Sequence, residues 1–597
     1  MAQSVPVTDF KDLSRLYTGR RQVRRLAKSE KRPICALDTE TYKGNIFLIA
    51  DSDGRYFDKG INAESMIEFL FAKKYQGSWN FFYNLGYDAE EILKLLGDGL
   101  NVYSSTRRTV FTYGDYRLRY IQGKCLQIMK GRHSAVFFDI AQYYNRVPLS
   151  KAYQDNIGIL QKEYLDFKAK RNQFSPRFYR DHTSQVRNYC IHDCQITRAI
   201  AEKWVSLFNG AFGFYPARWF SAGYLAEKVL INNGVNFPTF DSIPFPIQDL
   251  AFKSYFGGRF EILKRGFVGH ANLYDINSAY PYAITKIPDL ADGHWLSGKG
   301  IHPDATLGFF EIEANVPDAK NVPPFSFRVP GIVLFPSGRF RTYVTLAELL
   351  AVEKENYYKI LNSWQFIPNR PDYFPYAHFI EGLYDKRLAL KQAQDPMQLP
   401  IKIILNSIYG KTGQKVERVI GNLFNPVIFA FITGYTRAQL YRFVVDNGLE
   451  RDVVAFATDS ICTTRDLNLK SSRLGDFTLD KSGDDAYYLQ NGIYRFNGKW
   501  KERGLGSLGG KTIENVETIE KDGRPFLKMN VIRSPRLRSS ILRGRIGDIG
   551  KIKPVTRLVD LDADRKRFWL GKLQSVSDKV CNDSIPLSLS YFDKAEI

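Results

Sequence analysis

The chain of 597 residues has room for roughly three to five domains, which excludes a single small binding module. Its 84 Lys and Arg against 63 Asp and Glu leave a net charge of +21, which suits a polyanionic partner, either nucleic acid or an acidic membrane surface. No run approaches the roughly 18 apolar residues of a membrane helix, and no apolar signal-peptide core opens the chain. We therefore expect a cytoplasmic protein without a membrane partner, located in the host cytoplasm if the source is viral.

The predicted elements change character along the chain. Residues 1–33 form a basic arm, either solvated or lying along a phosphate backbone. The strands ICAL and IFLIA and the helical pattern AESMIEFLFAKKY predict an α/β region that runs to about Phe208. Strand-rich segments then lead into a helical block expected from Tyr343 to about Thr412, and strands return at VVAFATDSICTT. A second basic stretch, residues 533–553, holds seven basic residues and one acid.

Four carboxylates in the α/β region form the first chemical pattern. The segment ICALDTET places Asp38 and Glu40 two residues apart on a predicted strand, so both carboxylates leave the same face. Downstream, Asp88 follows in YNLGYDAEE, and Asp193 stands four residues after Tyr189 on one face of a predicted helix. Mg²⁺ prefers carboxylate oxygens, and two such ions can activate water and hold a leaving oxygen. The pattern therefore predicts nuclease chemistry.

The order DxE, NxxxD and YxxxD resembles the three motifs of the DnaQ-like 3′–5′ proofreading exonucleases. The resemblance implies that the four carboxylates bind metal and that Tyr189 orients the attacking water. It also implies DNA contacts from Asn84 and Tyr87. One family feature is absent, because Ile140 and Ala141 follow Asp139 where related polymerases carry a Ser/Thr-Leu pair that grips single-stranded DNA.

Three later segments form the second pattern. LYDINSAYPYAI predicts an apolar strand that ends at Asp275, followed by a turn and a helix. LPIKIILNSIYGKTG predicts a helix with Lys402, Asn406 and Tyr409 on one polar stripe. DVVAFATDSICTT predicts a β-hairpin with Asp459 at its tip. Two carboxylates around a metal pair, with a lysine at a triphosphate, suffice for phosphoryl transfer.

In this order the segments resemble motifs A (DxxSxYP), B (KxxxNSxYG) and C (xTDS) of family B DNA polymerases. The resemblance implies that Asp275 and Asp459 bind two catalytic metals, with a backbone carbonyl from Ile276. It makes Tyr280 a steric gate against a 2′-hydroxyl. Arg387 and Lys391 resemble the basic pair that meets the incoming triphosphate, although a solvated basic stripe also explains them. The implied nucleotide site comprises Ile276, Tyr280, Arg387, Lys391, Lys402, Asn406 and Tyr409.

The segment SYFGGRF resembles the YxGG segment of compact protein-primed polymerases from small bacteriophages, linear plasmids and related mobile elements. Glycines there let the backbone approach a template strand closely. The resemblance implies DNA contacts from Tyr255, Gly257 and Gly258, and from Tyr494 in the primer-holding segment LQNGIYRF.

Three features depart from the family pattern. Ala457 replaces the first Asp of motif C, so one acid remains in FATDS. The primer-holding KxY motif keeps Tyr494, but Gly492 stands in place of its lysine, which shifts the expected grip to Lys499, Lys501 or Arg503. Asp459 follows Lys402 by only 57 positions, which leaves little room for the insertion that encloses downstream DNA in the small-phage enzymes.

The motif order predicts a multidomain α/β and α+β protein with a ribonuclease H-like exonuclease domain followed by a right-hand polymerase. The expected divisions are a basic arm (1–33), the exonuclease (34–208), a connecting segment (209–260), a palm in two parts (261–365 and 419–510), fingers (366–418) and a thumb (511–597).

The leading hypothesis is a monomeric, DNA-templated DNA polymerase with a proofreading exonuclease. We expect two Mg²⁺ ions at each site, with Mn²⁺ as a substitute. The expected partners are a DNA primer-template, deoxynucleoside triphosphates and a terminal protein as primer for a viral or mobile-element genome. The alternatives are priming by ordinary nucleic acid, initiation without a primer, an exonuclease with a silent palm, and a degenerate polymerase that only binds nucleic acid.

Overall fold

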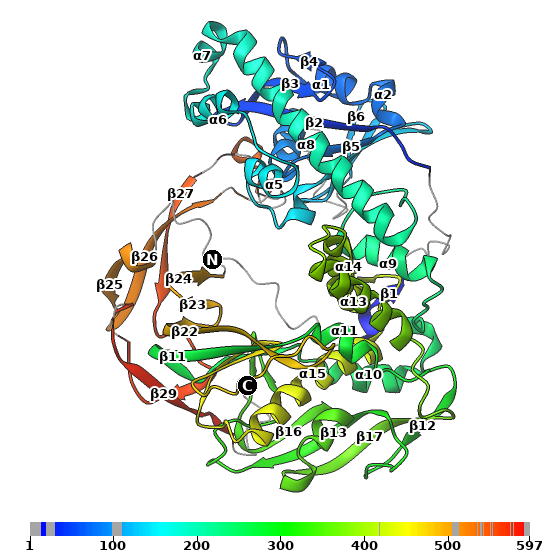
Figure 1. Ribbon diagram of the computed structural model, residues 1–597, viewed down its shortest axis with the longest axis vertical. Helices are drawn as coiled ribbons and strands as arrows, with labels where there is room; N and C mark the ends of the chain where they lie inside the picture. The colour runs from blue at the N-terminus through cyan, green and yellow to red at the C-terminus, as the bar shows by residue number, and fades with distance from the viewer. Residues whose placement is uncertain are drawn as a thin grey trace.

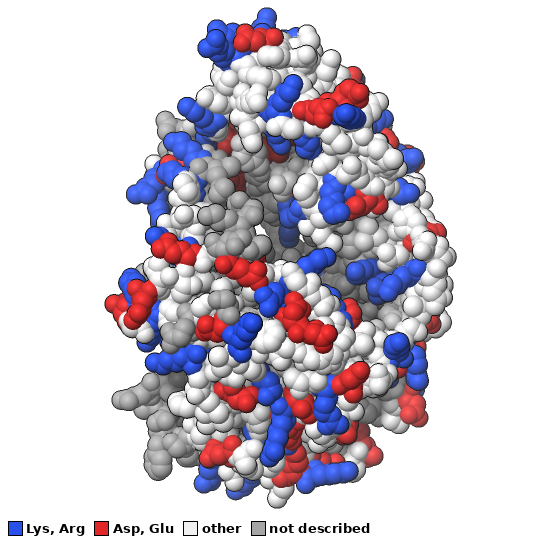
Figure 2. Space-filling view, turned by 60° about the vertical axis from the view of Figure 1, so that its left-hand side comes forward, with Lys and Arg blue, Asp and Glu red and all other residues white. Residues whose placement is uncertain are grey.

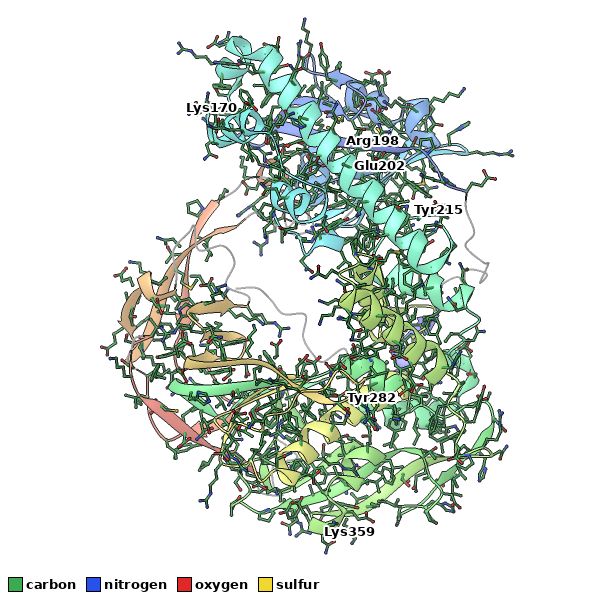
Figure 3. All side chains as sticks on the ribbon, viewed as in Figure 1. Lys170, Arg198, Glu202, Tyr215, Tyr282 and Lys359 are labelled. Carbon is green, nitrogen blue, oxygen red and sulfur yellow. The ribbon has the colours of Figure 1, made fainter. Side chains whose placement is uncertain are left out.

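The computed structural model describes residues 13–18, 30–97, 110–416, 418–503, 513–533, 543–549, 553–573 and 578–589, with Pro535, Leu537, Ser540, Lys551, Ser575 and Val576. Most of the predicted basic arm lies outside the described residues. The described elements lie around a central gap between the ribbons, with the N-terminal part at the top of Figure 1 and the C-terminal strands at the left. Side chains extend into this gap (Figure 3). Within the described part of the chain, no helix is long and apolar enough to span a membrane.

The N-terminal part is built on a mixed eight-stranded sheet. The segment ICALDTETY forms its central strand β2 (Ile34–Tyr42), which pairs in parallel with β5 (Trp79–Phe82). The remaining strands, in sheet order, are β4 (Tyr56–Phe57), β3 (Asn45–Asp51), β9 (His133–Asp139), β8 (Cys125–Lys130), β7 (Tyr116–Ile121) and β6 (Val110–Tyr113). These strands place the carboxyl end of β2 beside the helices that carry the other acids.

Helices cover this sheet and continue toward the rest of the molecule. The long helix α8 (Thr183–Phe212) lies against β2 and β3 and ends at Gly213, whose φ of +74° makes a left-handed cap. It therefore runs past the predicted boundary at residue 208. The other helices of this part are α1 (Ala63–Leu70), α2 (Lys73–Gln76), α3 (Gly86–Lys94), α5 (Leu149–Asn156), α6 (Lys162–Ala169) and α7 (Pro176–Asp181).

A nine-stranded sheet forms the centre of the molecule. Its path is β10 (Arg259–Ile262), β20 (Val453–Thr458), β21 (Ser460–Thr463), β11 (Lys264–Ile276), β22 (Phe477–Gln490), β23 (Ile493–Phe496) and β24 (Lys499–Glu502), with β28 (Arg567–Trp569) and β29 (Cys581–Pro586) beside it. Helix α15 (Pro426–Asp446) contains the apolar stretch from Val427 and is buried along most of its length. Its residues from Pro426 to Gly434 are buried on every side, which is typical of an interior helix.

Two helices stand beside this sheet and border the central gap between the ribbons (Figure 1). They are α13 (Ala377–Gln392) and α14 (Gln398–Thr412), as the sequence predicts. Ile404, Leu405 and Ile408 of α14 are buried, whereas Lys402 and Asn406 on the opposite face are exposed. The neighbouring helices are α9 (Ala222–Asn232), α10 (Phe245–Lys253) and α11 (Ala279–Ile284).

The predicted helical block from Tyr343 is wrong over its first third. After β16 (Ser337–Thr345) and the short helix α12 (Leu346–Leu350), the chain forms β17 (Tyr358–Pro368), which pairs with strands on both sides. The aromatic and β-branched residues of YKILNSWQFIP suit such a pleated surface. The sheet to which it belongs also contains β12 (Gly293–Ser297), β13 (Leu307–Val316) and the C-terminal β30 (Ser588–Leu589).

Smaller sheets complete the described structure. The strands β25 (Glu517–Lys521), β26 (Arg524–Arg533) and β27 (Lys553–Asp560) form an antiparallel sheet at the left of Figure 1. The others are a hairpin of β14 (Phe327–Val329) and β15 (Ile332–Leu334), and a sheet of β1 (Tyr17–Thr18), β19 (Val419–Ile420) and β18 (Lys415–Val416). Figure 2 shows the molecule hollowed at mid-height, with Lys and Arg side chains beside the hollow.

Candidate active sites

The first carboxylate cluster lies at the carboxyl end of β2. Asp38 and Glu40 leave the same face of this strand, and their carboxylate oxygens lie within 4.8 Å of each other and of the Cys190 sulfur. Thr39 donates a hydrogen bond of 2.6 Å to Asp88 on α3. Helix α8 brings in Asp193. The structure therefore brings together all four predicted acids.

Burial dominates the electrostatics of this cluster. It raises the pKa of Asp38, and the neighbouring charges of Asp88, Asp193 and Glu40 add to that rise. Burial also raises the pKa values of Glu40 and Asp88. Each charged carboxylate opposes ionisation of the next, so a divalent cation bound among them would favour the ionised forms.

The surroundings of the cluster fit such a cation. Glu40 is 2% exposed, and its Oε1 has no hydrogen-bond partner among the described residues. The Arg171 guanidinium is 3.8 Å from the other oxygen of Glu40, too far for a hydrogen bond. A donor set of four carboxylates with an unsatisfied oxygen suits Mg²⁺.

Three residues that no motif marks also belong to this cluster. Tyr164 on α6 donates to Asp193 and lies with its ring 5.5 Å from that of Tyr189. Lys168, one turn later, donates to the Tyr164 hydroxyl at 3.1 Å, and burial lowers its pKa. Together with Arg171 they place two cations beside four acids. The four-residue spacing of Tyr164 and Lys168, which places both on one face of a helix, is the sequence signal that could have indicated them.

Asn84 and Tyr87 lie beside the first cluster at one edge of the sheet. Asn84 has a φ of +64°; its N–H donates to Asp139, and its side-chain oxygen accepts from Arg146 at 2.8 Å. The Tyr87 hydroxyl lies 2.6 Å from that of Thr41. The two positions where a strand-gripping pair was expected, Ile140 and Ala141, are fully buried in the core.

The second cluster lines a cavity of about 520 Å³ beside the nine-stranded sheet. Asp275 at the end of β11 pairs in register with Ser460, and Ile276 N–H donates to the Asp459 carbonyl at 3.0 Å. Both predicted acids therefore face one space. The predicted lining residues Ile276, Arg387, Lys391, Lys402 and Asn406 contribute to the same cavity.

A tight turn presents Asp459 to this cavity. Thr458 has a φ of +73°, and the Asp459 N–H donates to the Ala457 carbonyl at 2.9 Å. This is a γ-turn with positive central φ, a strained conformation that non-glycine residues rarely adopt. Such a conformation persists only where the surrounding structure holds it.

Asp480 is an acid of this cavity that the sequence analysis missed. It lies on β22 between Leu479, opposite Tyr274, and Lys481, opposite Leu273, where the register shifts by one residue. A β-bulge turns the extra side chain to a new direction, and Asp480 lines the cavity. No motif marks the bulge, so the sequence offered no signal for this residue.

The acids and cations of this cavity face each other. Burial raises the pKa of Asp275 to about 7, and the charges of Asp459 and Asp480 add to the rise. Burial also raises the pKa of Asp459. Opposite them, burial lowers the pKa of Arg387, whose Nε is buried without a hydrogen-bond partner among the described residues. The arrangement fits divalent cations on one side and a polyphosphate on the other.

Three tyrosines pack together near Asp459, although they are not among the residues that line this cavity. The rings of Tyr280 and Tyr409 are 4.3 Å apart, and the Tyr255 hydroxyl lies 3.1 Å from that of Tyr409. Gly258 fits between them and the hairpin, because a Cβ there would lie 2.8 Å from Thr458 Cγ2 and 3.1 Å from the Tyr280 hydroxyl. The glycine is therefore required by close approach.

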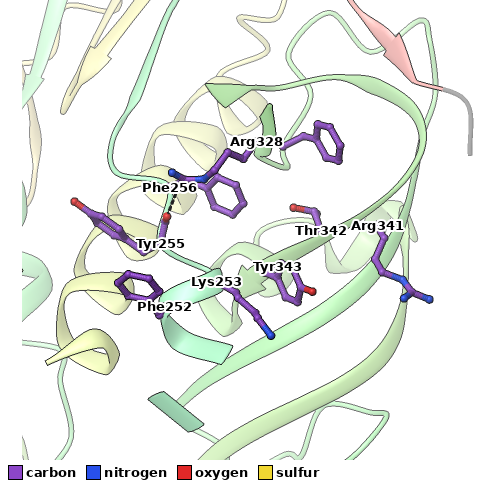
Figure 4. A pocket seen from close by; sticks show the side chains of 9 residues that line it. Phe252, Lys253, Tyr255, Phe256, Arg328, Arg341, Thr342 and Tyr343 are labelled. Atoms are coloured by element: carbon purple, nitrogen blue, oxygen red, sulfur yellow. Dashed lines mark hydrogen bonds between the residues drawn. The ribbon is translucent and has the colours of Figure 1, made fainter. Parts of the chain in front are cut away.

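Two arginines bind the backbone carbonyls of the YxGG segment. Arg328 donates to the Tyr255 carbonyl and lies over the Phe256 ring in a pocket of about 290 Å³ that Tyr343 also lines (Figure 4). Gly257 has a φ of +78°, and its carbonyl accepts from the buried Arg437. These contacts hold the segment that carries the predicted DNA-binding residues.

Tyr494 and Ala457 line a small cavity of about 30 Å³ on the same sheet. The Tyr494 ring stacks on Tyr488 at 5.0 Å, and the Lys501 ammonium lies 5.6 Å from the Tyr494 ring centre. Of the three cations expected to replace the missing KxY lysine, Lys501 thus lies beside Tyr494.

Comparisons with known proteins agree with this geometry. Residues 124–420, about half of the chain, match the family of DNA polymerases type B, organellar and viral. A DNA polymerase from Acidianus bottle-shaped virus is 24% identical over 298 residues, covering 47% of this chain and 44% of that protein. A probable DNA polymerase from Ascobolus immersus is 27% identical over 259 residues, covering 41% of this chain and 20% of that protein. The chain thus spans less than half of the length of these relatives.

Solved structures share the fold. Phi29 DNA polymerase complexed with primer-template DNA and incoming nucleotide matches 89% of this chain and all of its own, with a TM-score of 0.61 and 16% identity. The same polymerase complexed with single-stranded DNA matches 83% of this chain and 98% of its own, with a TM-score of 0.56 and 17% identity. The mixed α/β multidomain fold is therefore that of Phi29 DNA polymerase. The chain belongs to the type B DNA polymerases of the organellar and viral group.

Proposed function

We propose that this chain is a DNA-directed DNA polymerase that extends a 3′-hydroxyl and proofreads with a 3′–5′ exonuclease. The single observation that carries the proposal is the shared cavity, in which Asp275 and Asp459 face Lys402 and Arg387. We assign the exonuclease to the eight-stranded sheet, the palm to the nine-stranded sheet, the fingers to α13 and α14, and the thumb to β25, β26 and β27.

In the proposed polymerase site, Asp275, Asp459 and the Ile276 carbonyl hold two Mg²⁺ ions. When bound, such ions supply Lewis-acid stabilisation for nucleotidyl transfer. Lys402 and Lys391 line the same cavity and would meet the triphosphate, and the desolvated Arg387 guanidinium would supply hydrogen-bond donors there. The proximity of acids and cations is thus suited to a nucleoside triphosphate.

Selection of the nucleotide follows from the tyrosines. The rings of Tyr280 and Tyr409 pack against each other near Asp459, and a rigid wall under the sugar would exclude a 2′-hydroxyl. Asn406 lies on the same face of α14 as Lys402. We assign contacts with the primer and template to Tyr255, Gly257, Gly258 and Tyr494.

In the proposed exonuclease site, Asp38, Glu40, Asp88 and Asp193 hold two Mg²⁺ ions. Tyr189 presents its hydroxyl to the attacking water, and Asn84 and Tyr87 contact the single strand. Because Ile140 and Ala141 are buried, strand capture relies on other residues of this edge. Phi29 DNA polymerase has been observed with single-stranded DNA, which supports a site of this kind.

Replication primed by a terminal protein is the mode we propose, for a viral or mobile-element genome and a monomeric enzyme. It is supported by the YxGG segment and by the fold shared with Phi29 DNA polymerase. Ordinary nucleic-acid priming is the alternative; labelled nucleotide linked covalently to a protein in the absence of any nucleic-acid primer would distinguish protein priming from it.

A 5′-labelled primer annealed to a longer template tests both sites at once. The full chain with Mg²⁺ is expected to shorten the primer without nucleotides and to extend it to template length as four deoxynucleotides are added. A primer that never grows, with or without a protein primer, would reject the polymerase and leave an exonuclease or a nucleic-acid-binding protein.

A further inference from the structure

The C-terminal part of the chain returns to the central sheet. Strand β29 pairs antiparallel with β11, with Lys264 opposite Asp583 and Gly266 opposite Cys581, and β30 pairs in parallel with β16 (Figure 1). The approach is close, because a Cβ at Gly266 would lie 2.0 Å from the Val580 carbonyl oxygen. Residues more than 300 positions apart therefore share one sheet.

The C-terminal segment contributes a buried charged side chain, that of Arg567 on β28. The Arg567 side chain is 0% exposed. Its Nη1 donates to Glu261 Oε1 at 3.0 Å, its Nε to Ser584 Oγ at 2.7 Å and its Nη2 to Asn321 Oδ1 at 2.7 Å. The planar guanidinium thus joins the C-terminal segment to two separate parts of the chain.

Glu261 also binds a second arginine, Arg259. Its other oxygen accepts from Arg259 Nε at 3.0 Å and Nη2 at 2.7 Å. The Arg259 guanidinium lies between the rings of Phe335 and Phe456, at 4.0 and 4.2 Å from their centres. Two buried cations therefore share one buried carboxylate.

Two of the three charges lie on the strand next to the hairpin that carries Asp459. Strand β10 pairs with β20, with Glu261 opposite Phe456 and Arg259 opposite Thr458. Thr458 is the residue with positive φ that immediately precedes Asp459. A strained turn needs support from its surroundings, and this triad supports it from the neighbouring strand, where Arg259 lies opposite Thr458 and against the Phe456 ring.

We infer that Arg567 is a positioning residue for Asp459, so that the C-terminal segment sets the geometry of the polymerase site through Glu261 and Arg259. The inference rests on the proposed function, in which Asp459 holds metal. Buried ion triads contribute little net stability but are costly to break, since the remaining charge is left uncompensated. The triad would instead hold the hairpin with the precision that a metal-binding carboxylate requires.

The test replaces Arg567 by Lys in the full chain. Lysine keeps the charge but lacks the planar fork, so it cannot serve Glu261, Ser584 and Asn321 together. We expect kcat for primer extension to fall by about 10- to 100-fold, as small misplacements of reacting groups do, with the nucleotide KM changed by less than about threefold. Exonuclease activity, which belongs to another sheet, should be unchanged.

Arg265→Lys is the matched control. Arg265 is also 0% exposed and also joins the palm sheet to the C-terminal segment, through Asp562 and the Gly571 carbonyl. Among the described residues its hydrogen bonds reach neither β10 nor β20, and it lies at the opposite end of β11 from Asp275. Equal losses of extension in the two variants, or an equal loss of exonuclease activity in Arg567→Lys, would show a general role in folding and overturn the inference.

Amide hydrogen exchange over residues 453–463 gives a reading that does not depend on turnover. We expect these amides to exchange faster in Arg567→Lys than in either the wild type or Arg265→Lys. Exchange in Arg567→Lys at the wild-type rate would overturn the inference. If the wild type extends no primer, the proposed function fails, and this exchange measurement still decides whether Arg567 supports the hairpin.

Discussion

The two carboxylate clusters differ in how far they are enclosed. Glu40, Asp88 and Asp193 are 2–4% exposed in a well formed by one strand and three helices, whereas Asp275 and Asp459 line an open cavity of about 520 Å³. The first cluster has cations on the adjacent α6 segment; the second faces cations on α13 and α14. An enclosed site is suited to the end of a single strand, which is the substrate of an exonuclease. An open cavity is suited to a nucleotide together with a duplex.

This contrast predicts that the two activities can be separated by single side chains. Asp459→Asn removes a charge from the open cavity without changing its shape. Loss of a metal ligand removes several kcal/mol of transition-state stabilisation, so primer extension should fall by roughly a thousandfold or more. A gel assay on primer-template should show shortening at the wild-type rate, and persistent extension would contradict the assignment of Asp459.

The reverse separation is expected in the enclosed cluster. Changing Asp38 and Glu40 to Ala removes two of four acids, and degradation of a single strand should fall by roughly a thousandfold while extension continues. The rate of release of labelled nucleotide measures the loss. Digestion at an undiminished rate would sink the assignment of the first cluster.

Asp480 offers a smaller and sharper test of the open cavity. Its charge raises the pKa of Asp275, and its side chain lines the same space. We expect Asp480→Asn to reduce extension by about 10-fold and to raise the Mg²⁺ concentration needed for half-maximal rate, as loss of groups around a metal site does. Asp484→Asn, on the same strand but 90% exposed, is the matched control and should behave as the wild type.

Mg²⁺ should stabilise the fold more at high pH than at low pH. Burial raises the pKa of Glu40 from 4.5 to about 8 and that of Asp88 to about 6, so the folded protein holds extra protons across this range. Without metal, the contribution of these two groups to the stability of the fold is therefore greatest at low pH, and it is lost as the pH rises toward 8. Bound Mg²⁺ offsets the repulsion between the ionised acids.

Thermal unfolding measures this smallest effect. The rise in Tm on adding Mg²⁺ should be a few degrees larger at pH 8 than at pH 6 in the wild type, and much of the difference should vanish when Asp38 and Glu40 are replaced by Ala. Equal rises at both pH values would show that these acids are not linked to metal binding.

Much of both clusters was readable in the sequence. The two-residue spacing of Asp38 and Glu40, the hairpin around Asp459 and the polar stripe of α14 are local patterns, because strand and helix periods decide which side chains share a face. The family assignment and the mixed α/β multidomain fold are confirmed. The strand β17 was missed because its pairing with β12 and β13 is made between distant segments.

The sequence by itself determined the acids, their order and the elements that carry them. The tertiary structure decided which further residues join them. Asp480 enters the open cavity through a one-residue bulge, Lys168 and Arg171 reach the enclosed cluster from α6 and the turn after it, and Arg567 comes from the far end of the chain. Each depends on strand register or on packing between distant segments, and these long-range pairings carry no local periodicity in the sequence.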